Sequence, residues 1–168
     1  GYGYAMYDPT GDIADGSISA TWGLIGAPYV HGEVGFIFRK VDNQNFYAYI
    51  IDNHTACGNV SGYGTDGDPD EAIIKIENGI KTVLALNTNS GNSGTATYGW
   101  DGNRADMFAA YYDGQSIEFK IEMSGDDIKI SRKGGGGSAG TDWIESFSIS
   151  DSTFSEGSYG FYVHEQSG

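Results

Sequence analysis

Carboxylates are concentrated in one short polar stretch of the sequence, Asp66-Gly67-Asp68-Pro69-Asp70-Glu71. Acidic residues at alternate positions of a turning loop can converge on one cation, and Ca²⁺ takes about six to eight oxygen ligands. The stretch is not an EF-hand loop, because the sixth position of such a loop must be glycine and is Glu71 here. We predict that Asp66, Asp68, Asp70 and Glu71 bind Ca²⁺. The alternative is a solvated acidic loop that only adds solubility.

Two further groups of oxygen donors lie in other turn-rich segments. Asp101, Asn103 and Asp106 form the second predicted calcium set, within the polar residues 99–106. The competing interpretation is an Asx-type turn, in which Asp and Asn side chains bond to their own backbone. A weaker third set precedes the second expected strand and comprises Asp8, Asp12 and Asp15.

Aromatic residues accompany the two main acidic segments and suggest a ligand pocket. If both loops meet at one end of the domain, Tyr63, Tyr98 and Trp100 would form aromatic walls beside the metal. Asn53 and His54, at the start of the first loop, are predicted to contact the same ligand. Such a pocket suits a peptide terminus. It equally suits a calcium-dependent lectin, in which sugar hydroxyls replace metal-bound water. The remaining tryptophans, Trp22 and Trp143, are predicted to lie in the core.

Composition excludes several classes of function. The 168-residue chain has a formal charge of -14, so a nucleic-acid backbone or an anionic membrane surface would repel it. No apolar run is long enough to span a membrane as a helix. Cys57 is the only cysteine and the three histidines lack zinc spacing, so neither a disulfide framework nor a zinc site is expected.

The secondary-structure elements that would hold these residues in place are predicted to be strands, because no segment has sustained helical periodicity. Short alternating runs separated by glycine-rich turns favour one all-β domain, an antiparallel β-sandwich of jelly-roll type with long acidic loops. We expect it to span residues 1–168 as a monomeric module of a larger protein. The expected strands cover residues 1–7, 17–23, 33–41, 46–53, 72–77, 80–87, 107–112, 116–123, 127–133, 143–149 and 159–165.

The centre of this fold is predicted to be the hairpin in residues 33–53. Two apolar and aromatic runs flank a polar turn at residues 42–45, and symmetric closure would place Val41 opposite Phe46. Both faces of the hairpin are largely apolar, which indicates that each face is covered by other parts of the protein.

Four blocks of sequence resemble the concanavalin-like (laminin-G/thrombospondin C-terminal-like) jelly rolls: GEVGFIFRKVDNQNFYAYIID, AIIKIENGIKTVLAL, GQSIEFKIEMSGDDIKISRK and DSTFSEGSYGFYVHEQSG. The acidic loops, the start GYGYAMYD and the ending GFYVHEQSG look more narrowly like the calcium-dependent peptide-binding module of bacterial repeats-in-toxin adhesins. That resemblance implies an extracellular module on the bacterial cell surface, with Ca²⁺ in a site that binds peptide or glycoprotein C-termini on other cells.

The sequence therefore leaves two binding functions and one enzymatic function to compare. The leading hypothesis is calcium-dependent peptide binding, and the alternative is a calcium-dependent lectin with glycan partners. A glycoside hydrolase would need two carboxylates facing a cleft. Glu118 and Glu122 share one face of a predicted strand, but they alternate with core residues and are interpreted as surface. We therefore expect no enzymatic activity.

Overall fold

The computed structural model describes residues 2–7, 12–22, 32–53, 69–87, 117–134 and 142–165. Within these ranges there are strands and turns but no helix, and hence no helix long and apolar enough to cross a membrane. The predicted strand at 107–112 lies outside them. The strands are β1 (Tyr2–Tyr7), β2 (Gly16–Trp22), β3 (Gly32–Asp42), β4 (Asn45–Asn53), β5 (Pro69–Glu77), β6 (Ile80–Asn87), β7 (Ile117–Ser124), β8 (Asp127–Gly134), β9 (Ile144–Ser150) and β10 (Ser158–Glu165).

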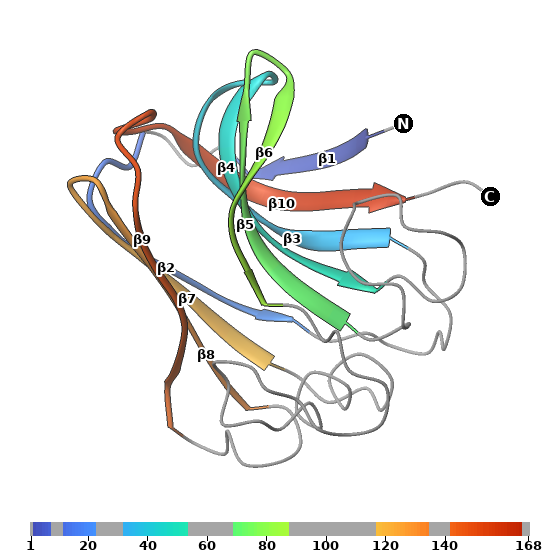
Figure 1. The fold of residues 1–168 in the computed structure, drawn as a ribbon, viewed down its shortest axis with the longest axis vertical. Helices are drawn as coiled ribbons and strands as arrows, with labels where there is room; N and C mark the ends of the chain where they lie inside the picture. Colours follow the sequence, from blue (N-terminus) through green and yellow to red (C-terminus); the bar gives the residue numbers. More distant parts are fainter. Residues whose placement is uncertain are drawn as a thin grey trace.

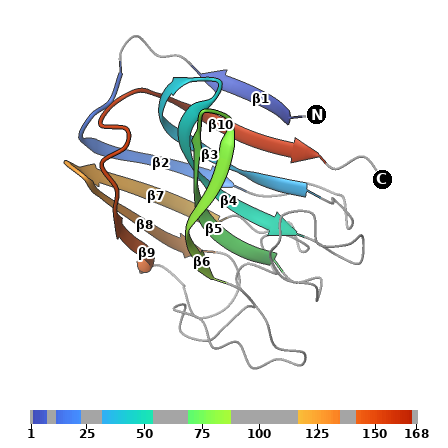
Figure 2. The same ribbon diagram turned by 45° about the horizontal axis from the view of Figure 1, so that its top comes forward.

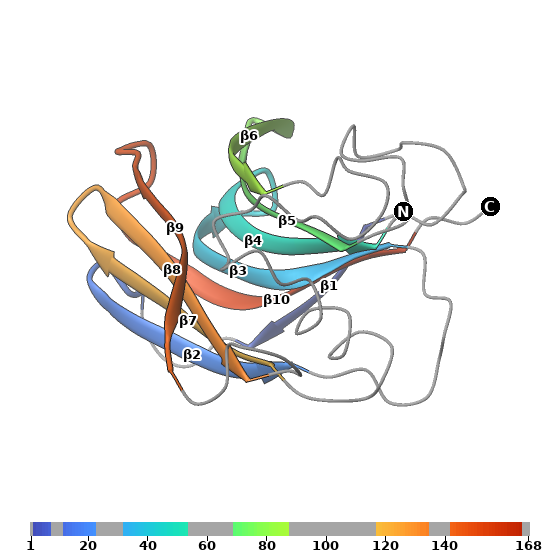
Figure 3. The same ribbon diagram turned by 60° about the horizontal axis from the view of Figure 1, so that its bottom comes forward.

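The strands form two antiparallel sheets that face each other, which confirms the predicted all-β sandwich (Figure 1). The larger sheet has the order β1-β10-β3-β4-β5-β6 and the smaller one the order β2-β7-β8-β9. Figure 2 shows both strand orders, and Figure 3 shows the sheets as two curved layers. The first strand starts beside the end of the last one, with Tyr2 opposite His164.

The six-stranded sheet is buried on both faces in its central strands, as the hairpin sequence predicted. Its inner face meets the four-stranded sheet in one apolar cluster, and its outer face forms a second cluster. Inner-face members include Phe36, Phe38, Tyr47, Tyr49 and Ile73. Outer-face members are Ile37, Phe46, Ala48, Ile50, Ala72, Ile74 and Tyr162, each about 1% exposed or less.

The central hairpin closes differently from the symmetric pairing that we predicted. Phe38 is opposite Tyr47, whereas Asp42 is opposite Asn45, so β3 contains extra residues between these two pairs. A bulge of this kind bends a strand and redirects its side chains. Val41 consequently lies in the bulge, 62% exposed, and not opposite Phe46. The prediction for Val41 was therefore wrong. The bulge also contains Arg39, which has a φ angle of 47°.

The hairpins formed by β5–β6 and β7–β8 agree with the sequence patterns. Asn78 and Gly79 have φ angles of 52° and 77°, which are the values expected of a two-residue type I′ turn. In β7, Phe119, Ile121 and Met123 are buried while the intervening charged residues remain partly exposed. One boundary was wrong: β5 begins at Pro69, so Asp70 and Glu71 belong to a strand and not to the preceding loop.

Candidate functional site

Glu71, a predicted calcium ligand, is a fully buried strand residue. It alternates with Ala72, which faces outward, and therefore lies on the inner face of the six-stranded sheet with Ile73. The Tyr49 hydroxyl donates a hydrogen bond to the Glu71 carboxylate at 2.5 Å. Calcium binding by Glu71 stays a prediction, and any such site must include a carboxylate that is already bonded to Tyr49.

Asp70 lies in a cross-strand row with two acidic residues that the sequence interpretation did not connect to it. Backbone register places Glu33 of β3 opposite Asp52 of β4, and Asp52 opposite Asp70 of β5. Like charges at directly opposite positions destabilise a sheet unless something compensates them. Glu33 and Asp52 were missed because only the strand register, and no short sequence spacing, brings them beside Asp70.

The remaining predicted site residues are not placed by the structure. Asn53 ends β4, where the structure gives its backbone position opposite Pro69. Outside the described residues lie Asp66, Asp68, Asp101, Asn103, Asp106, Tyr63, Tyr98, Trp100 and His54. Among the side chains that are described, no three His, Cys, Asp or Glu residues gather as a metal site would require. The predicted convergence of the two acidic loops stays a prediction.

A buried arginine links three segments at the turn end of the sandwich. Arg39 donates through Nη2 to the carbonyls of Ala14 at 2.9 Å and Gly125 at 2.7 Å, and through Nη1 to that of Phe154 at 3.3 Å. Asp15 lies 3.7 Å from the guanidinium and accepts a hydrogen bond from the Gly125 amide. Arg39 thus joins β3 to the residues before β2, the β7–β8 turn and the β9–β10 connection.

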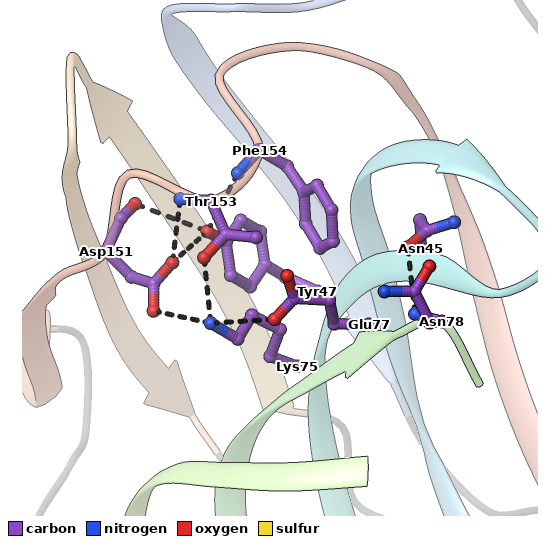
Figure 4. Close-up of polar contacts among 8 residues, drawn as sticks. All are labelled: Asn45, Tyr47, Lys75, Glu77, Asn78, Asp151, Thr153 and Phe154. Carbon is purple, nitrogen blue, oxygen red and sulfur yellow. Dashed lines mark hydrogen bonds and ion pairs between the residues drawn. The ribbon is translucent and has the colours of Figure 1, made fainter. Parts of the chain in front are cut away.

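A second polar network attaches the β9–β10 connection to the six-stranded sheet (Figure 4). The Tyr47 hydroxyl donates to the Asp151 carboxylate at 2.5 Å and accepts from the Phe154 amide at 3.2 Å. Lys75 donates to Asp151 at 3.2 Å and to the Thr153 hydroxyl at 2.8 Å. Each polar group in the network therefore has a partner within the protein, which is the arrangement expected of a structural link.

The surroundings of the Tyr47–Asp151 contact shift the pKa values of the two groups in opposite directions. Burial, together with the hydrogen bond to the Asp151 carboxylate, raises the pKa of Tyr47 to about 12. Burial alone would raise the pKa of Asp151. Hydrogen bonds from Tyr47, Thr153 and Lys75 outweigh it and lower that pKa from 3.8 to about 2. At neutral pH the pair is a neutral phenol that donates to a carboxylate.

The outer face of the four-stranded sheet presents a groove of about 880 Å³ near its turn end, lined by polar residues and by Met123 and Ile149. Across the sheet, Ser17 is opposite Glu122, Glu122 is opposite Lys129, and Lys129 is opposite Ser148. All four residues line the groove. Hydroxyl, carboxylate and ammonium groups therefore alternate along a single row, so the groove offers hydrogen-bond donors and acceptors side by side.

Trp143 extends the polar face beyond the groove. We predicted a core position for it, but its side chain is 36% exposed, so that prediction was wrong. Lys120 and Lys133, on the outer face of β7 and β8, place their Nζ atoms 4.9 and 4.6 Å from the centre of the indole ring. These distances are those of cation–π contacts. The residue was misassigned because an aromatic side chain at the start of a strand is more often buried than exposed.

Comparisons with known proteins identify the fold. No protein-family model matches the chain, and no curated protein matches it. Among solved structures, the chain is similar to the carbohydrate binding module CBM66 from Bacillus subtilis, with a TM-score of 0.56 and 19% sequence identity. The match covers 93% of this chain and 71% of that chain. At this identity the similarity shows a shared fold. It agrees with the predicted jelly-roll class and leaves the narrower adhesin resemblance a prediction.

Proposed function

We propose that this β-sandwich is a glycan-binding module. The observation that supports it most directly is the groove on the outer face of the four-stranded sheet, where Ser17, Glu122, Lys129 and Ser148 form one polar row. A sugar presents several hydroxyl groups, each able to donate and accept, and this row supplies both kinds of partner. Binding requires no chemical step, so the proposal assigns no catalytic residue.

The fold similarity favours a glycan over the peptide ligand that led the sequence interpretation. The similar solved structure is a carbohydrate binding module. A position on the bacterial surface, as the adhesin resemblance implies, is compatible with a glycan-binding role and remains part of the proposal.

Calcium dependence is the second component of the proposed function. Asp70 of the predicted ligand set lies in a backbone row with Glu33 and Asp52. In the sequence, Asp52 and Asp70 flank the stretch that contains Asp66 and Asp68. Several carboxylates at neighbouring positions suit a hard cation with oxygen ligands. The ion would hold the loop beside the sheet and reduce repulsion within the acidic row.

The experiment that tests the function is titration of the purified domain with a panel of glycans and with C-terminal peptides, in calcium and in chelator. We expect binding to at least one glycan and none to the peptides. Peptide binding without glycan binding would reject the proposal. Calcium that binds only the folded state should raise the melting temperature. An identical melting curve in chelator would remove the metal from the proposal and leave the glycan part standing.

A further inference from the structure

The exposed indole of Trp143 is flanked by charges that compensate one another. Lys120 forms an ion pair with Glu122 at 3.2 Å, and Lys133 forms one with Glu118 at 3.0 Å. The two lysines also contact the Trp143 ring. The result is a continuous series of groups on the outer face of the four-stranded sheet, in which acid, base and aromatic ring alternate.

Each lysine in the ion pairs of the outer face is matched by a glutamate, in contrast with the excess of acid in the whole chain, and Asp127 adds one further carboxylate to the groove. A third pair, Lys129 with Glu145 at 2.9 Å, completes a set of three lysines and three glutamates. The chain carries a formal charge of -14, so an anionic glycan would meet long-range repulsion and find no uncompensated lysine in this set. A neutral glycan has no such penalty. Its hydroxyls can accept from an ammonium group and donate to the adjacent carboxylate.

The groove and Trp143 lie along the same face and are linked by Lys120. Glu122 lines the groove and lies 3.2 Å from Lys120 Nζ, which is 4.9 Å from the centre of the indole ring. The groove continues to Asp127, and the six residue steps from Asp127 to Lys133 along β8 correspond to about 20 Å at the usual rise per strand residue. A disaccharide can therefore bridge Glu122 and Trp143, whereas a ligand that fills the groove as far as Asp127 and also contacts Trp143 must be longer.

From these observations we infer that the outer face binds an extended, uncharged oligosaccharide that runs along β7 and β8 from the groove to Trp143. This inference rests on the proposed glycan-binding function and adds the ligand class and the second contact. The negative face of the indole attracts the weakly positive C–H groups on one side of a sugar ring. The Nζ atoms of Lys120 and Lys133 lie over the ring, and they hydrogen-bond the hydroxyls of the sugar that reaches it.

The test combines ligand length with a substitution at Trp143. We expect calorimetric affinity for neutral glucan, mannan, galactan or xylan oligosaccharides to increase from the disaccharide to the hexasaccharide. Trp143→Ala should lower affinity for the hexasaccharide about tenfold and affinity for a monosaccharide, which cannot contact the groove and the ring together, by less. Trp143→Phe should retain most of the affinity, because it keeps an aromatic face. Ile80→Ala, at an exposed apolar residue of β6, is the control and should change neither.

Each outcome separates the inference from the proposed function. If the wild-type domain binds glycans but Trp143→Ala binds the long ligand equally well, the second contact is wrong and the function survives. If acidic polysaccharides bind more tightly than neutral ones, in a manner that salt screens, the ligand class is wrong. Absence of binding to every glycan would reject the proposed function and the inference together. Circular dichroism of each variant confirms that the fold is retained.

Discussion

The outer faces of the two sheets differ in almost every physical respect. On the six-stranded sheet the outer face is apolar and covered, with Ile37, Ala48 and Ile50 about 1% exposed or less. On the four-stranded sheet it is polar, and Lys129 and Ser148 are exposed beside a groove. A face that is buried stabilises the fold, whereas a charged face that remains in contact with water is available for a ligand. Under the proposed function, the six-stranded sheet is a structural sheet and the four-stranded sheet is a recognition sheet.

The sequence already contains this difference in its two hairpins. The strand pair β3–β4 has apolar residues at successive positions, as in Phe36, Ile37 and Phe38, so both faces must be covered. The strand β7 alternates strictly between buried residues and charged ones. Continuous and alternating patterns therefore distinguish strands that are covered on both faces from strands with a solvent-facing side.

The largest expected effect comes from placing one charge on each outer face. Ala48→Asp puts a carboxylate into the covered outer cluster of the six-stranded sheet, and an unpaired buried charge costs about 3–5 kcal/mol. Ser148→Asp adds the same group to the exposed face of the four-stranded sheet, beside Lys129. It should change the free energy of unfolding by less than about 0.5 kcal/mol. Urea denaturation measures both, and equal losses would contradict the comparison.

The next effect tests whether the structural sheet also holds the sandwich together. Arg39→Met keeps an unbranched side chain but removes the donors to the carbonyls of Ala14, Gly125 and Phe154. The contact to the Phe154 carbonyl is buried, and those to Ala14 and Gly125 are partly buried. An unpaired buried acceptor costs about 1–3 kcal/mol and a partly buried one costs less, so we expect a loss of about 3 kcal/mol overall.

Lys40→Met is the matched control for Arg39, because it removes a neighbouring cation that is less buried. Urea denaturation should show a much smaller loss for this variant. If Arg39→Met is as stable as the control, the hydrogen bonds of Arg39 do not hold the three segments.

Most strands were predictable from local sequence patterns. The bulge in β3 and the start of β5 were not, because they depend on contacts between residues far apart in the sequence. The bulge in β3 contains Arg39, whose partners lie 25, 86 and 115 residues away in the sequence. Asp70 and Glu71 were assigned to a loop because acidic residues after a proline disfavour strands. Pairing with β4 overrides that preference.

The candidate site was predictable only in part, for the same reason. The alternation in β7 located Glu118, Lys120 and Glu122 on one exposed face, which the structure confirms. The polar row of the groove, however, takes one residue from each of four strands, so it becomes visible only after their register is known. Trp143 was assigned to the core because apolar character was the only local signal.

A smaller loss of stability is expected when the network of Tyr47, Lys75 and Asp151 is disturbed. The lowered pKa of Asp151, about 2 instead of 3.8, means that its ionised form favours the folded state. That stability is complete above about pH 4 and is lost as the pH falls toward 2. Asp151→Asn should therefore destabilise the domain by about 1–2 kcal/mol at pH 7 and by much less near pH 2.

The opposite end of the pH scale provides an independent check on the same contact. The raised pKa of Tyr47, about 12, means that its protonated form favours the folded state, so the stability is complete below about pH 10 and is lost toward pH 12. Tyr47→Phe should abolish this alkaline dependence. Melting temperatures across the pH range measure both variants. A constant difference from wild type at every pH would exclude ionisation of Asp151 and Tyr47 as the cause.

The smallest stability change is expected on the recognition sheet, where the largest change in binding should occur. Lys129→Gln removes an exposed ion pair with Glu145 and replaces a charged donor in the groove by a neutral amide. Exposed ion pairs contribute little to folding, so the urea midpoint should not change measurably. Affinity for a neutral oligosaccharide should fall about fivefold, because one charged hydrogen-bond donor to a hydroxyl is lost.

Glu77→Gln is the matched variant for Lys129→Gln on the other sheet. It removes the partner of Lys75 at 3.6 Å, at an exposed position away from the groove. It should change neither stability nor affinity. Each variant neutralises one exposed charged side chain of an ion pair, with opposite signs in the two cases. A neutral glycan responds little to net charge, so a difference between the variants in glycan affinity reports the location of the pair. Equal affinities would remove the groove from the binding site, and the division between a structural sheet and a recognition sheet would then rest on burial alone.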